Sequence, residues 1–210
     1  MAVLVLQDEF APLLLARGFV RSNKVFRRTP GDGMGMTVWL NPENRLKHVR
    51  TVNVDCWVDD EDQGWLYSLD QARAVSEIER RGARASFDYT PDMPDWPAVI
   101  VEDFERVTLP FIDACTSPAA LCDLLLEGRV PPSNMKRAPV GWFEDVWSIA
   151  DRARLSGYGD TALERLGSLQ LTRSDHDNVQ WWAVQQGIDD LVLNAPLPSP
   201  RRWFGRRRQR

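Results

Sequence analysis

The alternation of side chains from Arg50 to Val58 restricts the fold of this chain more than any other feature. Two sets of residues alternate along it: Val52, Val54, Cys56 and Val58 on one side, and Thr51, Asn53, Asp55 and Trp57 on the other. Successive side chains of a β-strand point to opposite faces of its sheet, so the segment predicts a strand with one dry and one largely wet face. This pattern is typical of an antiparallel sheet that is covered on one side.

Other segments predict the remaining strands of this sheet. They are residues 24–28, which follow a turn at Asn23, residues 36–40, and residues 85–89. The glycine-rich stretch 29–35 leads into a strand, whereas a phosphate-binding loop leads into the N-terminus of a helix, so we interpret it as a hairpin turn. Asn41-Pro42 is expected to end the strand that precedes it. We therefore predict a mostly antiparallel sheet of four strands.

Helical periodicity and terminal signals predict helices in most of the remaining chain. The predicted helices cover residues 7–17, 68–81, 98–114, 117–127, 142–155, 161–171 and 174–194. The fourth of these helices has the best-defined ends. Ser117 fits its N-cap, Pro118 its first turn and Gly128 its C-terminal stop. Pro110 predicts a bend in the third helix, since proline lacks the N–H donor.

Several helix ends carry more specific expectations. Capping boxes are predicted at Ser68-x-x-Gln71, Thr161-x-x-Glu164 and Ser174-x-x-Asp177. Gly18 is expected to end the first helix, and Pro12 suits that helix only if it begins nearby. In the last helix, an apolar stripe needs a partner surface, and it is formed by Trp181, Val184, Ile188 and Leu191.

These segments group into an α+β protein with four regions. Residues 1–128 are expected to form an α+β domain, in which helices cover one face of the four-stranded sheet. Residues 129–141 contain three prolines and are interpreted as a linker. Residues 142–195 form a helical region that packs on the first domain, and residues 196–210 combine a stiff Pro-rich segment with a disordered basic tail.

Three cysteines bear on the compartment: Cys56, Cys115 and Cys122. Their odd number, together with an N-terminal apolar run too short for a signal or a membrane span, favours a reducing environment. We expect three free thiols in a cytoplasmic protein without a transmembrane segment, with Cys56 on the buried face of the sheet.

No motif in the chain predicts a catalytic, cofactor-binding or metal site. His48 and His176 have no cysteine near them in sequence, which does not match zinc-ligand spacing. The acidic run 59–62 could hold a hard cation or mimic phosphate, but a solvated strand end explains it better. Asp175 and Asp177 flank His176 in a predicted first helical turn, where Asp is favoured by the helix dipole in any case.

A basic tail follows an acidic body. The chain has 26 Lys+Arg and 30 Asp+Glu, and six arginines lie in the last ten residues, so the first 200 residues carry 20 basic and 30 acidic side chains, a net charge of −10. The candidate anion-binding residues of the tail are Arg201, Arg202, Trp203, Phe204, Arg206, Arg207, Arg208 and Arg210. These residues could bind anionic lipid or nucleic acid weakly. The alternative is a solvated tail without a partner.

A second group of basic residues lies at the front of the predicted domain. It comprises Arg17, Arg21, Lys24, Arg27 and Arg28, with Arg45, Lys47 and Arg50 further on. Lys and Arg often protect the edge of a sheet from aggregation, which explains such a group without a partner. The alternative is a face on which an anionic partner docks.

The order of elements resembles a known family. Arg17-Gly18-Phe19 ends a helix, residues 24–28 and 36–40 form strands around a glycine loop, and residues 107–113 and 117–126 form a Pro-Phe helix and a small capped helix. This order resembles a bacterial domain-of-unknown-function family, number four-three-zero-four, over about residues 7–128. The resemblance implies an α+β domain and transfers no catalytic residue.

Two classes of function remain open from the sequence. The first is a non-enzymatic binding or interaction module, for example of an immunity or adaptor type, that docks on a protein partner. The second is an enzyme whose site is assembled from scattered Asp, Glu, Arg and Trp side chains. A deep pocket with converging carboxylates would favour the enzyme, whereas a shallow face with exposed aromatic side chains would favour the binding module.

Overall fold

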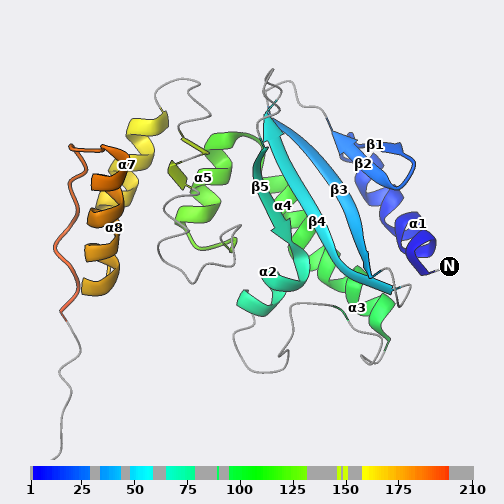
Figure 1. Ribbon diagram of the computed structural model, residues 1–210. Helices are drawn as coiled ribbons and strands as arrows, with labels where there is room; N and C mark the ends of the chain where they lie inside the picture. The colour runs from blue at the N-terminus through cyan, green and yellow to red at the C-terminus, as the bar shows by residue number, and fades with distance from the viewer. Residues whose placement is uncertain are drawn as a thin grey trace, which may run out of the picture.

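The protein is an α+β structure built around one antiparallel sheet of five strands (Figure 1). The computed structural model describes residues 2–28, 34–43, 48–58, 65–78, 89, 95–131, 146–147, 149–150 and 158–198. The strands are β1 (Val20–Ser22), β2 (Val25–Arg28), β3 (Met34–Glu43), β4 (His48–Val58) and β5 (Trp65–Asp70). Each strand pairs with the next along the chain, so the sheet is a meander.

Helices lie behind this sheet and beyond one of its edges. They are α1 (Ala2–Leu15), α2 (Gln71–Ile78), α3 (Trp96–Asp103), the π-helical segment η1 (Phe104–Thr108), α4 (Leu109–Ala114), α5 (Pro118–Leu126), α7 (Tyr158–Ser168) and α8 (Arg173–Gln186). In Figure 1, α1, α3 and α4 lie behind the sheet, whereas α5, α7 and α8 lie beyond β5. The helices behind the sheet leave its other side facing the viewer.

The main core fills the space between the sheet and the helices behind it. The strands contribute buried side chains that include Phe26, Met36, Val38, Val52, Val54, Cys56, Tyr67 and Leu69. Phe10 of α1 stacks on Phe104 of η1, with the ring centroids 4.0 Å apart. The predicted dry side of β4 is confirmed at Val52, Val54 and Cys56, which have no exposed surface.

The predicted α+β class is confirmed, but the sheet has five strands instead of four. Two of its strands are not among the predicted four: β1, and β5, whose last three residues are predicted to begin a helix. Ser68 lies within this strand opposite Asp55, and α2 begins only at Gln71. Asp70 receives the cap hydrogen bond in place of Ser68, because the backbone N–H of Arg73 donates to its carboxylate at 2.9 Å.

The strand predicted at residues 85–89 lies outside the described residues except for Tyr89. The backbone N–H of Tyr89 donates to the carbonyl oxygen of Arg50 at 2.7 Å. The buried Tyr89 side chain takes part in a polar network described below.

The limits of β3 and α1 differ from the prediction. β3 includes Gly35 and continues through Asn41-Pro42 to Glu43, because a register shift at that dipeptide accommodates the proline. Helix α1 begins at Ala2 and contains Pro12, which leaves Asp8 and Glu9 inside the helix instead of in its first turn.

Burial explains why α1 tolerates Pro12. An internal proline costs a helix about 3 kcal/mol. Leu6, Phe10 and Leu14 lie on one side of α1 and are at most 2% exposed, and each such side chain contributes roughly 1.5–3 kcal/mol by burial. Packing of this face therefore outweighs the local penalty. Gly18, at φ 79°, takes the left-handed conformation that ends the helix, as predicted.

The region from Trp96 to Ala114 is helical, as expected for residues 98–114, and its irregularity precedes Pro110. The N–H of Leu109 donates to the carbonyl oxygen of Phe104, five residues earlier, which defines the π-helical segment. Pro110 has no N–H to donate to the carbonyl of Arg106, so the α-helical pattern is interrupted in the turn before it.

The best-delimited predicted helix, α5, is confirmed at both ends. The Ser117 side chain accepts a hydrogen bond from the N–H of Ala120 at 3.1 Å, and Pro118 is the first helical residue. Gly128 has a φ of 66°, as a C-terminal stop requires.

The predicted starts of the two later helices, α7 and α8, are wrong. α7 begins at Tyr158, so Thr161 lies inside it and does not cap it. α8 begins at Arg173 and is capped by Thr172 in place of Ser174. The Thr172 hydroxyl accepts from the N–H of Asp175 and donates to its carboxylate, at 3.3 and 2.7 Å, so the capping box lies two residues earlier than predicted.

The predicted apolar stripe of α8 is also wrong. The helix ends at Gln186, before Ile188 and Leu191. Trp181 and Val184 are 59% and 70% exposed, whereas the buried side of α8 is formed by Val179, Trp182 and Ala183. Trp182 meets Trp147 edge to face, with centroids 6.4 Å apart, and this contact helps to determine which side of the helix faces inward.

No helix in the described part of the chain is both long and apolar enough to cross a membrane. Most of the predicted linker and of the helix at 142–155 lies outside the described residues, as does the whole basic tail. The division of the chain into a first domain and a helical region stays a prediction.

Candidate functional site: the open face of the sheet

The two faces of the sheet have different surroundings. The helices α1, α3 and α4 pack on one face (Figure 1). We call the other the open face, because the one described helix that meets it is α2, whose first turn contacts β4 at Thr51. The register places open-face residues in rows across the strands. One row contains Arg27, Thr37, Asp55 and Ser68, and the neighbouring row contains Ser22, Val25, Trp39, Asn53 and Asp70.

Trp57 lies against the backbone of the neighbouring strand. It pairs with Gly35, where a β-carbon would collide with three atoms of the indole ring. The indole N–H of Trp57 donates to the hydroxyl oxygen of Thr37 at 3.3 Å. Gly35 therefore makes room for the ring, and the hydrogen bond helps to hold it in place while the side chain stays partly exposed.

Trp39 is held through Asp55. Its indole N–H donates to one carboxylate oxygen of Asp55 at 2.6 Å, and the Ser68 hydroxyl donates to the other at 2.7 Å. Asp55 had been expected to face water, but these two bonds make it the link between β3, β4 and β5. Charge-assisted hydrogen bonds of this kind are stronger than neutral ones, so the orientation of Trp39 is well determined.

Asn53 lies beside Trp39 on the same row and makes no side-chain hydrogen bond. It is 9% exposed, and its buried Oδ1 has no partner among the described residues. An amide offers both donors and an acceptor, and an unpaired buried one is costly. Asn53 is therefore a hydrogen-bonding group of the open face that a bound partner could satisfy.

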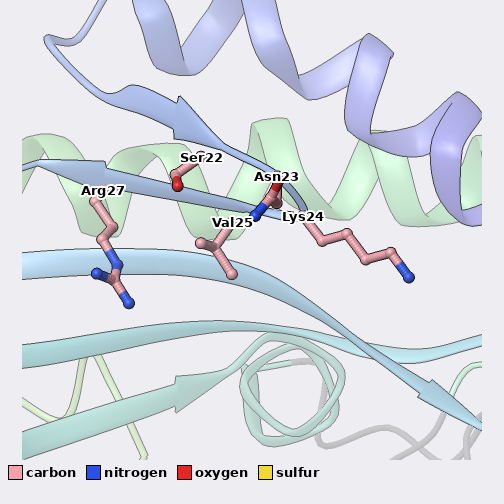
Figure 2. Close-up of a pocket in the computed structure, with 5 residues that line it drawn as sticks. All are labelled: Ser22, Asn23, Lys24, Val25 and Arg27. Carbon is pink, nitrogen blue, oxygen red and sulfur yellow. The ribbon is translucent and has the colours of Figure 1, made fainter.

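The hairpin of β1 and β2 borders a hollow of about 690 Å³ on this side of the molecule (Figure 2). Its lining residues are Ser22, Asn23, Lys24, Val25 and Arg27. Figure 2 shows Val25 between the two cations, with Lys24 reaching away from the turn and Arg27 projecting across β3. Asn23 has a φ of 54°, the left-handed conformation that a tight turn uses and that Asn tolerates.

The structure divides the basic group at the front of the domain into two sets. Arg17 binds both carboxylate oxygens of Asp113 at 2.7 and 2.9 Å, and this hydrogen bonding raises the pKa of Arg17. Arg21 pairs with Asp8 of α1 at 2.8 Å. Arg28 lies 5.1 Å from the centroid of the Phe19 ring. These three side chains tie the hairpin and α1 to the rest of the fold.

Lys24 and Arg27 form the other set. Among the described Lys and Arg side chains, they and Arg173 are the ones without an ion pair, hydrogen bond or ring contact. Both are exposed, and both line the hollow. Arg45 and Lys47 lie outside the described residues, and Arg50 has an interaction of its own.

A second polar cluster lies inside the fold at the π-helical segment. The Tyr89 hydroxyl donates to Asp103 at 2.8 Å, Arg106 pairs with the same carboxylate at 2.9 Å, and the Gln71 amide donates to the Tyr89 oxygen at 2.8 Å. The Thr108 hydroxyl donates to the Gln71 side-chain oxygen at 2.5 Å. Because its members satisfy one another, this network is suited to holding α2 against η1.

The three cysteines are free, as expected, and all three are buried, which was predicted only for Cys56. A hydrogen bond with Cys115 and burial raise the pKa of Cys56, and burial raises the pKa of Cys122 to about 12. The Cys56 and Cys122 thiols therefore stay protonated at neutral pH and are not activated nucleophiles. In the described residues, no cluster of His, Cys, Asp and Glu is arranged to hold a metal ion.

The candidate tail residues 201–210 lie outside the described residues, so their role stays a prediction. The acidic run 59–62 lies outside them too. Comparison of the chain with protein-family models, with curated proteins and with solved structures gave no match.

Proposed function

We propose that this protein is a non-enzymatic binding module that docks on another protein through the open face of its sheet. The observation that carries the proposal is the pair of partly exposed indoles, Trp39 and Trp57, each held in place by a side-chain hydrogen bond on a face that no described helix covers.

Fixed aromatic side chains are well suited to binding. Protein interfaces are enriched in Trp, Tyr and Arg, and a few such residues supply most of the binding energy. A side chain that is already ordered loses less entropy when it binds, a loss of about 0.5–1.5 kcal/mol for a mobile side chain. Asp55 and Thr37 therefore support the binding role by fixing the two rings before a partner arrives.

The enzyme alternative needs titratable groups that converge on a cavity. The described carboxylates nearest to such an arrangement are already engaged, since Asp55 accepts two hydrogen bonds and Asp103 is held by Tyr89 and Arg106. Both carboxylates act as structural acceptors, which favours the binding module. A cytoplasmic location, the family resemblance and an immunity-type or adaptor-type role remain part of the proposal.

Site-specific photo-crosslinking in the native host tests the docking face. We would place p-benzoylphenylalanine at the exposed Ser22 of the open face, which makes none of the hydrogen bonds that hold Trp39 and Trp57, and, as a matched control, at the exposed Glu105 of η1. We expect a discrete crosslinked protein from position 22 and none from position 105. Adding Trp39→Ala should abolish the adduct while the thermal melt stays cooperative. Equal crosslinking from both positions, or an adduct that persists without Trp39, would contradict the docking face.

A further inference from the structure

The hollow beside the β1–β2 hairpin contains two cations without partners on an otherwise acidic body. Lys24 and Arg27 are exposed and unpaired, whereas Arg17, Arg21 and Arg28 at the same end of the domain are engaged. The first 200 residues together carry a net charge of −10. Charges interact over about 8–10 Å at physiological salt, so a ligand in the hollow senses mainly this local pair.

The neighbouring carboxylates do not neutralise the pair. Asp55 keeps its negative charge, but it lies two strands from Arg27 in the same row, about 10 Å away, and its carboxylate binds Trp39 and Ser68. Asp8 pairs with Arg21 on the other face of the hairpin. The hollow is therefore an electropositive spot with an apolar centre, because Val25 lies between the two cations (Figure 2).

We propose that this hollow receives an acidic extended segment of the protein partner, an inference that rests on the docking function proposed above. Carboxylates of the segment pair with Arg27 and Lys24, and an apolar side chain between them packs on Val25. The guanidinium of Arg27 offers a planar pair of donors that fits a carboxylate.

The same register extends this contact across the sheet. Val25, Trp39 and Asn53 are consecutive members of one row, and neighbouring strands are about 4.8 Å apart. The row therefore spans about 10 Å from β2 to β4, roughly three residues of extended chain. A segment anchored by its acids at the hairpin passes over Trp39 and places its backbone beside the unpaired Asn53 amide.

Charge favours a short acidic peptide over nucleic acid. A polyanion that followed the row past Asn53 would reach the carboxylate of Asp70 on β5, and Asp55 lies in the neighbouring row. Phosphates along the whole face would meet these like charges, whereas a short segment confines its acids to the hairpin.

Peptide titration followed by NMR tests the proposal. The probes are a capped peptide of about eight residues in which Glu and Val alternate, its counterpart with Gln in place of Glu, and an oligothymidine of about ten nucleotides. We expect the Glu peptide to bind with a millimolar Kd and to shift the amides of residues 24–27 together with the Trp39 indole N–H. The double variant Lys24→Ala/Arg27→Ala should weaken it about three- to tenfold, because two exposed ion pairs are lost.

Arg173→Ala is the matched control, since Arg173 is exposed and unpaired but lies on α8. It should leave peptide binding unchanged. The inference is overturned if the Gln peptide binds equally well, if Arg173→Ala weakens binding as much as the double variant, or if only the oligonucleotide binds. Lack of binding by any probe also overturns it.

The two proposals can fail separately. If the crosslink from position 22 persists in Lys24→Ala/Arg27→Ala, the docking face stands and the acidic segment is wrong. If the crosslink is absent even from the unchanged sequence while the Glu peptide still binds at the hairpin, the acidic site stands and the proposed docking face is wrong.

Discussion

The two sides of β4 show how differently a sequence pattern can be translated into structure. On the covered side, Val52, Val54 and Cys56 are buried, as their apolar character predicts. On the open side, Thr51 and Asn53 are also buried, and Asp55 holds Trp39 and Ser68. The polar side of the strand is therefore an organised surface and not merely the wet side of a sheet. This organisation distinguishes a candidate interface from a solvated strand.

The largest expected effect tests the covered side. Val54→Asp should unfold the protein or cost more than about 4 kcal/mol, because it places an unpaired carboxylate in the core. Circular dichroism during urea unfolding measures the change. Thr37→Ser on the open side is the control, since it keeps the hydroxyl that accepts from Trp57. A mild effect of Val54→Asp would show that the register is wrong.

Gly35→Ala tests whether the open side is packed. The new β-carbon would collide with the Trp57 ring, so the ring must move, and we expect a loss of about 1–3 kcal/mol. The Trp57 indole N–H resonance should shift with it. Gly159, which is partly exposed and whose surroundings leave room for a β-carbon, is the matched control. If Gly35→Ala and Gly159→Ala are equally stable, the open side of β4 is not packed around Trp57 as described.

Asp55→Ala should cost about 2 kcal/mol, in contrast to the small cost expected for a residue that faces water. It removes the acceptor of two hydrogen bonds and leaves the Trp39 indole N–H without its partner. Thermal melts measure the loss, and the Trp39 indole resonance should broaden or shift. A variant as stable as the unchanged protein, with an unshifted resonance, would return Asp55 to the role of a solvated side chain.

Alkaline pH should weaken the fold through the buried thiols. The pKa of Cys122 is raised to about 12 in the folded protein, so its stabilising contribution is complete below the ordinary value of 9.0 and is lost as the pH rises from 9.0 towards 12. The loss amounts to about 1.4 kcal/mol at about pH 10. Cys56 acts in the same direction, because its pKa is also raised.

Urea unfolding at neutral pH and at about pH 10 measures this loss, and Cys122→Ala should reduce the difference between the two. If the pH dependence of Cys122→Ala matches that of the unchanged protein, the thiol is not the group responsible. Thiol titration of the unfolded protein should count three groups, as for three free cysteines.

The sequence by itself determined those features that depend on neighbouring residues. The alternation around Val54 predicted the strand and its dry side, and Ser117, Pro118 and Gly128 predicted both ends of α5. Strand periodicity, a cap hydroxyl and a positive-φ glycine all act within a few residues, so they can be recognised before the chain folds. The signal for the candidate site was also present, since Trp57 shares a side of the strand with Asp55.

Only the tertiary structure decided the features that depend on distant partners. Ser68 joined a strand because β4 lies beside it, and Pro12 stayed inside α1 because the core buries that helix on both sides of the proline. The separation of Lys24 and Arg27 from the paired arginines depends on where Asp8 and Asp113 fall in space. Burial and ion pairing are properties of the assembled surface, and no local pattern contains them.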